Sequence, residues 1–484
     1  MKTGGQAINE RIWKRPNEFV ISVSLILLVA CLLIVFAQPK NGSHANKDGE
    51  APVVAIEPLA FVLAPQTGDS RTDREIRRLQ EKVRDANNPE LVLEQLGWAF
   101  VSKARESFDA GFYRLAEQCA QCIEKMNPQS QAAMLLRGHV LHNLHRFKES
   151  EALARRLVEQ RGLGFDYGLL GDVLMEQGRL SEAVVAYQQM MNLKPDLQAY
   201  ARAAHIRWLK GDLAGAIEAM RLAVGATTPL DPESAAWVNT RLAAYEFQAG
   251  RFAEAEQRCA LALSFQSNYA PALLLRGKML LTQDKFEAAI TDLRTAAKFN
   301  PLPEYQWALA DALRAGPHCE SEASAIEAEL QQHGAASDPR TFAVFLATRH
   351  QSPDTALRLA KTEFDSRSDV FTHDAFAWSL AAAGKLTEAR SEMERALAEG
   401  TEDGRLFFHA AVIASQTGDA AATRRWLDKA TNLSHVLLPS ERGELESLSA
   451  RRANENLSVA PKTGKPFSLS KTSERKSQTP NPQT

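Results

Sequence analysis

A small residue recurs along this chain about once every 34 positions, and this period constrains the fold more than any other feature. The recurring positions are Ala116, Ser150, Ala183, Ala216, Ala255, Ala289, Ala323, Ala356, Ala389 and Thr423, separated by 34, 33, 33, 39, 34, 34, 33, 33 and 34 residues. A compact domain with a single core does not require such a period. A stack of similar helical hairpins does, because each hairpin meets the next through the same close contact. The chain is therefore predicted to be an all-α solenoid.

The repeat unit is clearest from residue 164 to residue 197. Its predicted apolar positions are Tyr167, Leu170, Gly171 and Leu174 in a first helix, and Leu180, Ala183, Tyr187 and Met190 in a second helix. Each set falls on one helical face. Gly178 separates the two sets, as expected of a residue that adopts the left-handed conformation at a helix end, and Pro195 stops the second helix. One unit is therefore two helices joined by a glycine turn.

These residues resemble the tetratricopeptide repeat family, whose pattern of large, small, Gly, Ala and Pro positions they follow from Tyr167 to Pro195. The resemblance covers residues 96–438 and implies a right-handed superhelix of about ten helical hairpins, a scaffold that binds other proteins. Small residues let the helices approach closely within and between hairpins. The residues expected to carry this packing are Ala116, Gly138, Gly171, Ala183, Ala216, Ala255, Gly277, Ala289 and Ala389.

Two stretches depart from the pattern. The 39-residue step carries an insertion near residues 227–232, which predicts a longer loop between the fourth and fifth hairpins. Repeat seven has Asp311 where the first helix should carry a small residue, and repeat eight has Val344 there. These two repeats are expected either to be distorted or to mark a break between two sub-arrays.

Residues 19–37 form an uncharged apolar run of 19 residues. As a helix this run would span roughly 28 Å, which matches the hydrocarbon core of a bilayer. Lys2, Arg11, Lys14 and Arg15 precede it, and this excess of positive charge predicts that the N-terminus stays in the cytoplasm. The chain is therefore expected to be a single-pass protein of a bacterial inner membrane, with its repeats in the periplasm.

Three interpretations of this run compete. We favour an uncleaved signal anchor, because the run is longer than the apolar part of a signal peptide. A signal peptide cleaved after Ala37 is the second interpretation, since small residues precede that point at suitable spacing. The third is a lipoprotein modified at Cys31, although the apolar run continues past this cysteine.

The predicted organisation has five parts. Residues 1–18 form a cytoplasmic segment and residues 19–37 the transmembrane anchor. Residues 38–95 form a spacer that includes a short polar helix at 74–84, capped by Thr72 and Asp73. Residues 96–438 form the solenoid, and residues 439–484 a terminal helix near 440–450 followed by a disordered basic tail.

Composition narrows the function. The 484 residues have a formal net charge of −2, which gives no basis for nucleic-acid binding, and five cysteines do not provide a disulfide framework. The chain contains no phosphate-binding loop, HExxH or GxSxG motif. We therefore expect neither an enzyme nor a cofactor, metal or small-molecule substrate.

The family resemblance implies that the first helices of the hairpins line a concave groove that receives an extended peptide or a helix. The candidate groove residues are Arg105, His139, His142, Asp172, His205, Trp208, Arg241, Phe247 and Lys278. Trp and Arg are frequent among residues that dominate binding energy. The groove lacks the Lys-Asn-Asn-Lys-Arg pattern with which some family members hold a chaperone's C-terminal carboxylate, so that ligand is not expected.

An alternative function is that of a metal-handling or redox accessory protein. His139, His142 and His145 are spaced by three residues, and the first two could bind zinc or nickel together with Asp172. Cys119 and Cys122 form a CAQC sequence. This alternative is less favoured, because only two histidines align with the groove and the cysteines fall within a predicted helix rather than after a strand.

Overall fold

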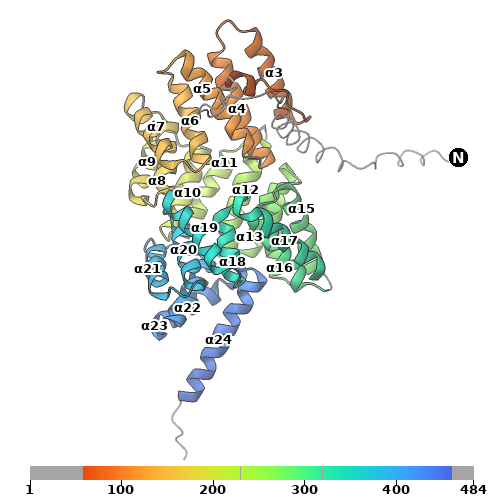
Figure 1. Cartoon of the computed structure of the whole chain (residues 1–484), viewed down its shortest axis with the longest axis vertical. Coiled ribbons are helices and arrows are strands. Elements are labelled where there is room, and N and C mark those ends of the chain that lie inside the picture. The colour runs from red at the N-terminus through yellow and green to blue at the C-terminus, as the bar shows by residue number, and fades with distance from the viewer. Residues whose placement is uncertain (1–57, 229, 318–319, 460–484) are drawn as a thin grey trace, which may run out of the picture. The chain divides into compact units, whose positions relative to one another are not determined.

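The computed structural model describes residues 58–228, 230–317 and 320–459, and every regular element in these ranges is helical. Ten hairpins follow one another along the chain (Figure 1). The first five are α4 (Glu90–Ser107) with α5 (Gly111–Met126), α6 (Gln131–Asn143) with α7 (Phe147–Gln160), α8 (Gly164–Glu176) with α9 (Leu180–Leu193), α10 (Leu197–Leu209) with α11 (Leu213–Gly225), and α12 (Pro232–Gln248) with α13 (Phe252–Phe265). The other five are α14 (Ala270–Leu281) with α15 (Phe286–Phe299), α16 (Pro303–Ala315) with α17 (Glu320–Ser337), α18 (Pro339–Thr348) with α19 (Pro353–Ser366), α20 (Val370–Ala382) with α21 (Leu386–Leu397), and α22 (Gly404–Gln416) with α23 (Ala420–Asn432). The predicted all-helical solenoid is confirmed.

The periodic small residues lie at the tightest points of the packing. Ala116, Ala183, Ala216, Ala255, Ala289 and Ala389 are fully buried in the second helices. The small residues of the first helices face large side chains of a neighbouring helix. A Cβ atom would lie 2.6 Å from Leu169 at Gly138, 2.3 Å from Tyr187 at Gly171 and 2.5 Å from Leu293 at Gly277. A larger residue at these positions would therefore push two helices apart.

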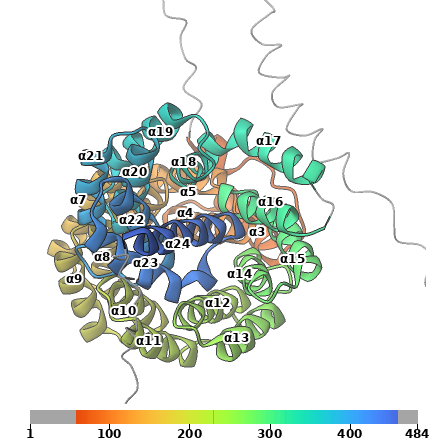
Figure 2. The same cartoon turned by 90° about the horizontal axis from the view of Figure 1, so that it is seen from below.

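The hairpins wind into a superhelix in which a later turn, formed by α16 and the elements after it, stacks on an earlier turn, formed by α4 to α15. Figure 2 shows the hairpins as a ring seen along the superhelix. The residues that hydrogen-bond across the two turns are 154 to 194 positions apart in the chain. Thr401 donates its hydroxyl to the carbonyl of Leu209 at 2.6 Å, and Lys210 pairs with Glu399 at 2.6 Å. The two turns are thus in direct contact, and no gap separates them at these residues.

Donors from the later turn satisfy carbonyls at the C-terminal ends of first helices in the earlier turn. Helix ends leave such carbonyls without partners inside the helix. The donors and the carbonyls are Ser368 with Glu176 of α8, Thr401 with Leu209 of α10, His435 with Phe247 of α12, and Arg442 with Leu281 of α14. The stacking of the turns therefore completes the hydrogen bonding of four successive first helices.

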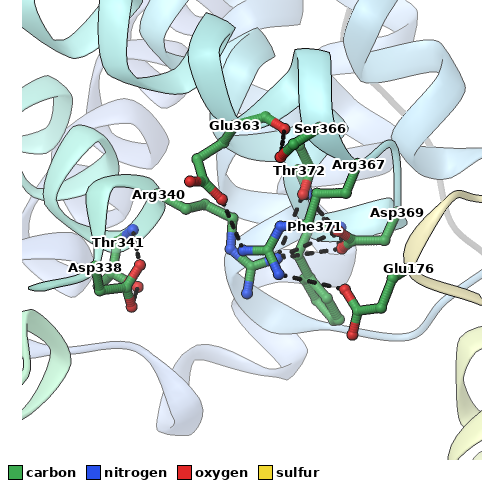
Figure 3. Close-up of polar contacts among 10 residues, drawn as sticks. All are labelled: Glu176, Asp338, Arg340, Thr341, Glu363, Ser366, Arg367, Asp369, Phe371 and Thr372. Atoms are coloured by element: carbon green, nitrogen blue, oxygen red, sulfur yellow. Dashed lines mark hydrogen bonds and ion pairs between the residues drawn. The ribbon is translucent and has the colours of Figure 1, made fainter. Parts of the chain in front are cut away.

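A buried ionic cluster reinforces the same junction (Figure 3). Arg367 lies 3.3 Å from Glu176 of the earlier turn and 3.2 Å from Glu363 of its own helix. Arg340 donates to Asp369 at 3.3 Å. Burial alone would raise the pKa of Asp369, but the charges of Arg340 and Arg367 outweigh it and the pKa is lowered. Asp369 is therefore a charged link between these arginines.

Repeats seven and eight do not break the array. The α16–α17 and α18–α19 hairpins are both formed, and the first helices α14, α16, α18 and α20 pack in sequence. Asp311 is buried where a small residue was expected, and it accepts two hydrogen bonds from Ser440, at 3.0 Å from the backbone and 2.6 Å from the hydroxyl. Arg349 also contacts Asp311. The departure from the repeat pattern is thus an anchor for the C-terminal helix.

That helix, α24 (Pro439–Val459), is longer than the predicted 440–450 and follows a short 3₁₀ turn, η1 (Ser434–Val436). It packs against α16, α22 and α23, and Figure 2 shows it inside the ring of hairpins. Glu441 is fully buried and paired with Arg405 at 2.5 Å, and Leu445 and Leu448 are buried in the main core. The concave side of the later turn is therefore covered by the chain's own α24.

The N-terminal end of the array also begins earlier than expected. Helix α3 (Arg71–Asp85) contains the predicted polar helix, but its cap is Ser70 rather than Thr72, in a reciprocal pair with Asp73. Ile76 and Leu79 are buried in one core with α4 and α5, as is Val62 of α2 (Pro58–Val62). Residues 71–85 therefore belong to the array rather than to a free spacer.

The apolar run at residues 19–37 and the tail beyond residue 459 lie outside the described residues. Among the helices that are described, none is both long and apolar enough to cross a membrane.

Candidate partner-binding cavity

The first helices of the earlier turn enclose a cavity of about 810 Å³. Its walls come from α4, α6, α8, α10 and α12, with single contributions from Tyr187 of α9 and Met220 of α11. Six of the nine predicted groove residues lie on these walls: Arg105, His139, His142, Asp172, His205 and Arg241. The volume falls within the range of roughly 300–1,000 Å³ in which proteins bind ligands, and apolar surface predominates on the walls.

The other three predicted residues do not line the cavity. Trp208 donates its indole N–H to the carbonyl of Glu402 at 3.1 Å, in the contact between the two turns. Phe247 is 3% exposed and packs against His435. Lys278 of α14 pairs with Glu304 at 2.7 Å. Each side chain follows the first-helix pattern, but the later turn or the next hairpin occupies the surface it faces.

The most constrained group on the cavity wall is Asp172. Arg202 donates two hydrogen bonds, of 2.8 and 2.7 Å, to its carboxylate, and Tyr187 donates a third at 2.9 Å. Burial alone would raise the pKa of Asp172, but the charge and hydrogen bonds of Arg202 outweigh it, so the pKa is lowered. This bidentate pair ties α8 to α10 and leaves no net charge for a ligand.

A second charged pair on the cavity wall joins α4 to α12. Arg105 and Glu233 approach to 3.7 Å, which is a looser pair than that of Asp172. Burial raises the pKa of Glu233, and Arg105 only partly counteracts it. The pair therefore bridges the first and the last helix of the cavity wall.

Arg241 has a different environment. Its Nη2 lies 3.3 Å from Nδ1 of His205 and donates to the hydroxyl of Tyr245 at 3.3 Å, and its guanidinium stacks on the Tyr245 ring at 5.3 Å. Burial, followed by the charge of Arg241, lowers the pKa of His205 to about 3. Burial also lowers the pKa of His139 to about 3. Both histidines are therefore neutral near pH 7, and the guanidinium is the charged member of its group.

Sequence reasoning missed the aromatic walls of the cavity, which are Trp98 of α4, Phe165 of α8 and Trp237 of α12. Phe165 is 50% exposed and Trp237 36% exposed. Trp237 stands four residues before Arg241, on the same face of α12. Helix α12 has 17 residues where α6, α8 and α10 have 13, so the insertion lengthens this helix as well as the loop before it. All three aromatic residues stand six residues before the small residue of their first helix, and this shared repeat position was the signal that could have identified them.

The repeats match a known family. Residues 101–163 and 168–235 match the family model described as tetratricopeptide repeat. These two segments are therefore similar to tetratricopeptide repeats. They include α6 to α11, together with parts of α4, α5 and α12, and therefore most of the cavity wall. No curated protein sequence matches the chain.

Several solved structures resemble the helical array in part. A chain of the APC/C hetero-tetramer Cut9–Hcn1 is 14% identical with a TM-score of 0.41, over 76% of this chain and 62% of that chain. Yeast Tom70 is 14% identical with a TM-score of 0.31, over 80% of this chain and 93% of its own. A thermophilic tetratricopeptide protein of Thermus thermophilus is 20% identical with a TM-score of 0.33, over 38% of this chain and 99% of its own. At these scores we transfer no function from them.

The residues of the metal or redox alternative do not assemble into one site in the helical array. His145 stacks on Phe147 beyond the end of α6, whereas the His139 ring packs at a tilt against Trp98 in the cavity. Cys119 and Cys122 are buried in α5, and burial raises the pKa of the Cys119 thiol well above its usual range, which disfavours the reactive thiolate. Across the described ranges, no group of three or more His, Cys, Asp or Glu side chains is arranged to hold a metal ion.

Proposed function

We propose that this protein is a non-enzymatic, membrane-anchored tetratricopeptide scaffold that binds a segment of a partner protein in the cavity of its earlier turn. The observation that carries the proposal is the cavity of about 810 Å³ itself, on the face formed by successive first helices. Exposed Phe165 and Trp237 on its walls provide apolar surface that a partner side chain would bury.

The later turn does not present its concave side to a partner in the same way. Helix α24 covers its concave side through Arg405, Glu441, Leu445 and Leu448. A long polypeptide therefore does not thread through the whole superhelix. The partner segment enters from the earlier turn, where α4 and α12 bound the cavity.

The membrane setting is the part of the proposal that rests on sequence. The uncharged run at residues 19–37 and the basic residues before it favour an anchor with a cytoplasmic N-terminus. This arrangement would place the array on the exported side of a bacterial inner membrane, where the scaffold would assemble a complex near the bilayer. A reporter active only outside the cytoplasm, fused after residue 459, tests the orientation. An inactive reporter would overturn the predicted orientation. N-terminal sequencing distinguishes an anchor from a cleaved signal peptide.

Site-specific photo-crosslinking in intact membranes tests the scaffold. A photoreactive residue is placed at Phe165 or at Trp237 in the full-length protein, and the captured proteins are identified. The control position is Val185, which is 62% exposed on the second helix of the same hairpin as Phe165 and lies outside the cavity. We expect one partner to be captured from both cavity positions and not from Val185. Equal capture at Val185, or no capture in the cavity, contradicts the proposal.

A further inference from the structure

The charged groups of the cavity do not balance. Three arginines and two carboxylates lie on its walls. Arg202 is paired with Asp172 at 2.7 Å and Arg105 with Glu233 at 3.7 Å. Among the residues that the structure describes, no carboxylate lies within ion-pair distance of Arg241, whose contacts are His205 and Tyr245. The walls therefore carry one more cationic than anionic group.

The contacts of Arg241 orient its guanidinium without neutralising it. Both hydrogen-bond contacts use Nη2, and the guanidinium carbon lies over the Tyr245 ring at 5.3 Å from its centre. A guanidinium has five N–H donors, and within the described residues neither Nε nor Nη1 has an acceptor. Donors of a held guanidinium that face a cavity suit the two oxygens of a carboxylate.

Apolar surface adjoins this cation. Trp237 lies one helical turn before Arg241 on α12, and Tyr245 one turn after it. Trp98 of α4 stands on another wall, and its ring centre lies 5.4 Å from that of His139. A ligand that places an anionic group on Arg241 would therefore have aromatic surfaces beside it for a neighbouring apolar side chain.

We infer that the cavity takes a peptide segment in which a carboxylate stands next to an aromatic or large aliphatic side chain, with the carboxylate on Arg241 and the apolar side chain against Trp237. The inference deepens the proposed function and rests on it, because it assigns a chemistry to the partner segment of the same cavity. It follows from the excess charge of the walls, and the two paired arginines contribute nothing to it.

Selection from a random peptide library tests the inference. Displayed 12-residue peptides are selected on the detergent-solubilised full-length protein and, in parallel, on its Arg241→Gln and Arg221→Gln variants. Arg221 is the matched control, since it pairs with Glu246 at 3.0 Å and is not a cavity residue. We expect Asp or Glu beside an aromatic residue to be enriched on the wild type and on Arg221→Gln, but not on Arg241→Gln. Thermal unfolding of each variant checks that it is folded.

A selected peptide is then synthesised with its acidic residue as Asp or Glu and as the matching amide. The amide should bind the wild type at least tenfold more weakly, and the two forms should bind Arg241→Gln equally. Arg241→Lys should retain part of the preference, because it keeps the charge. Enriched peptides that bind the cavity without an acidic residue overturn this inference and leave the scaffold standing. Selected peptides that do not reduce partner capture by a photoreactive residue at Trp237 contradict the proposed function itself.

Discussion

The side-chain hydroxyl of Ser368 donates a hydrogen bond of 2.9 Å to the carbonyl of Gln177, although 191 residues separate them. The backbone N–H of Ser368 bonds the adjacent carbonyl of Glu176 at 3.1 Å. These bonds join the end of α8 in the earlier turn to the loop before α20 in the later one. Gly178 permits this approach, because a Cβ atom there would lie 2.2 Å from the Ser368 carbonyl oxygen.

Gly178→Ala should therefore separate the two turns locally. Gly178 and Gly250 have nearly equal positive φ values of 72° and 70°, but a Cβ atom at Gly250 has no neighbour within 4 Å. Gly250→Ala should cost about 1–2 kcal/mol for the left-handed backbone alone. Gly178→Ala should cost about 1–3 kcal/mol more, from overpacking. Thermal unfolding and hydrogen exchange at Ser368 measure the difference, and equal losses in the two variants would show that the turns do not depend on this contact.

Asp311 should hold α24 in place. Asp311→Ala removes the acceptor of both Ser440 hydrogen bonds and leaves Arg349 with one buried partner fewer. Removing one partner of a buried ion pair typically lowers the free energy of unfolding by about 3–5 kcal/mol. Ser440→Ala, the matched change on the other side, removes one hydroxyl hydrogen bond and should cost about 1 kcal/mol. Limited trypsin digestion should cleave at Arg451 faster in Asp311→Ala than in Ser440→Ala. Unchanged protection of α24 in Asp311→Ala would contradict this anchoring role.

Two tryptophans should separate stability from binding. Trp208→Phe removes the hydrogen bond to the Glu402 carbonyl and should lower the free energy of unfolding by about 1 kcal/mol, with partner capture unchanged. Trp237→Ala should reduce partner capture several-fold with little loss of stability, because Trp237 is 36% exposed on the cavity wall. Photo-crosslinking yield from Phe165, compared with thermal unfolding, measures both. If Trp208→Phe lost capture while remaining stable, the binding surface would extend into the contact between the turns.

The half-buried histidines of the cavity should make the earlier turn sensitive to acid. His139 and His205 have folded pKa values of about 3, against an ordinary value of 6.5 in an unfolded chain. Between these values the unfolded chain binds more protons than the folded one. The free energy of unfolding therefore falls as pH drops from 6.5 toward 3. Denaturant unfolding between pH 7 and pH 4 should show a smaller loss in His205→Asn than in the wild type.

His333 provides the control for this titration, because its side chain is exposed on α17. His333→Asn should leave the pH dependence as it is in the wild type. A wild type whose stability is flat from pH 6.5 to pH 4 would mean that the two cavity histidines are already solvated.

The residues on the cavity wall show how far the sequence could predict a site. His139, Asp172 and Arg241 were identified because they occupy the inward face of a first helix, and that face follows from the repeat pattern alone. Trp208 and Phe247 satisfy the same rule, yet the later turn occupies the surface they face. Trp237 was missed because it stands near the start of α12, six residues before the small residue Ala243, whereas the predicted groove residues lie between two residues before and four residues after that position.

The sequence by itself determined the hairpins, because their packing joins residues that are close in the chain. Gly171 lies against Tyr187, and Ala183 is buried in the second helix of the same hairpin. Only the tertiary structure decided which first helices remain open to a partner. That outcome depends on the stacking of turns about 190 residues apart and on the docking of α24 at Asp311. The position of the later turn is the sum of small rotations at every hairpin junction, and no local pattern specifies such a sum.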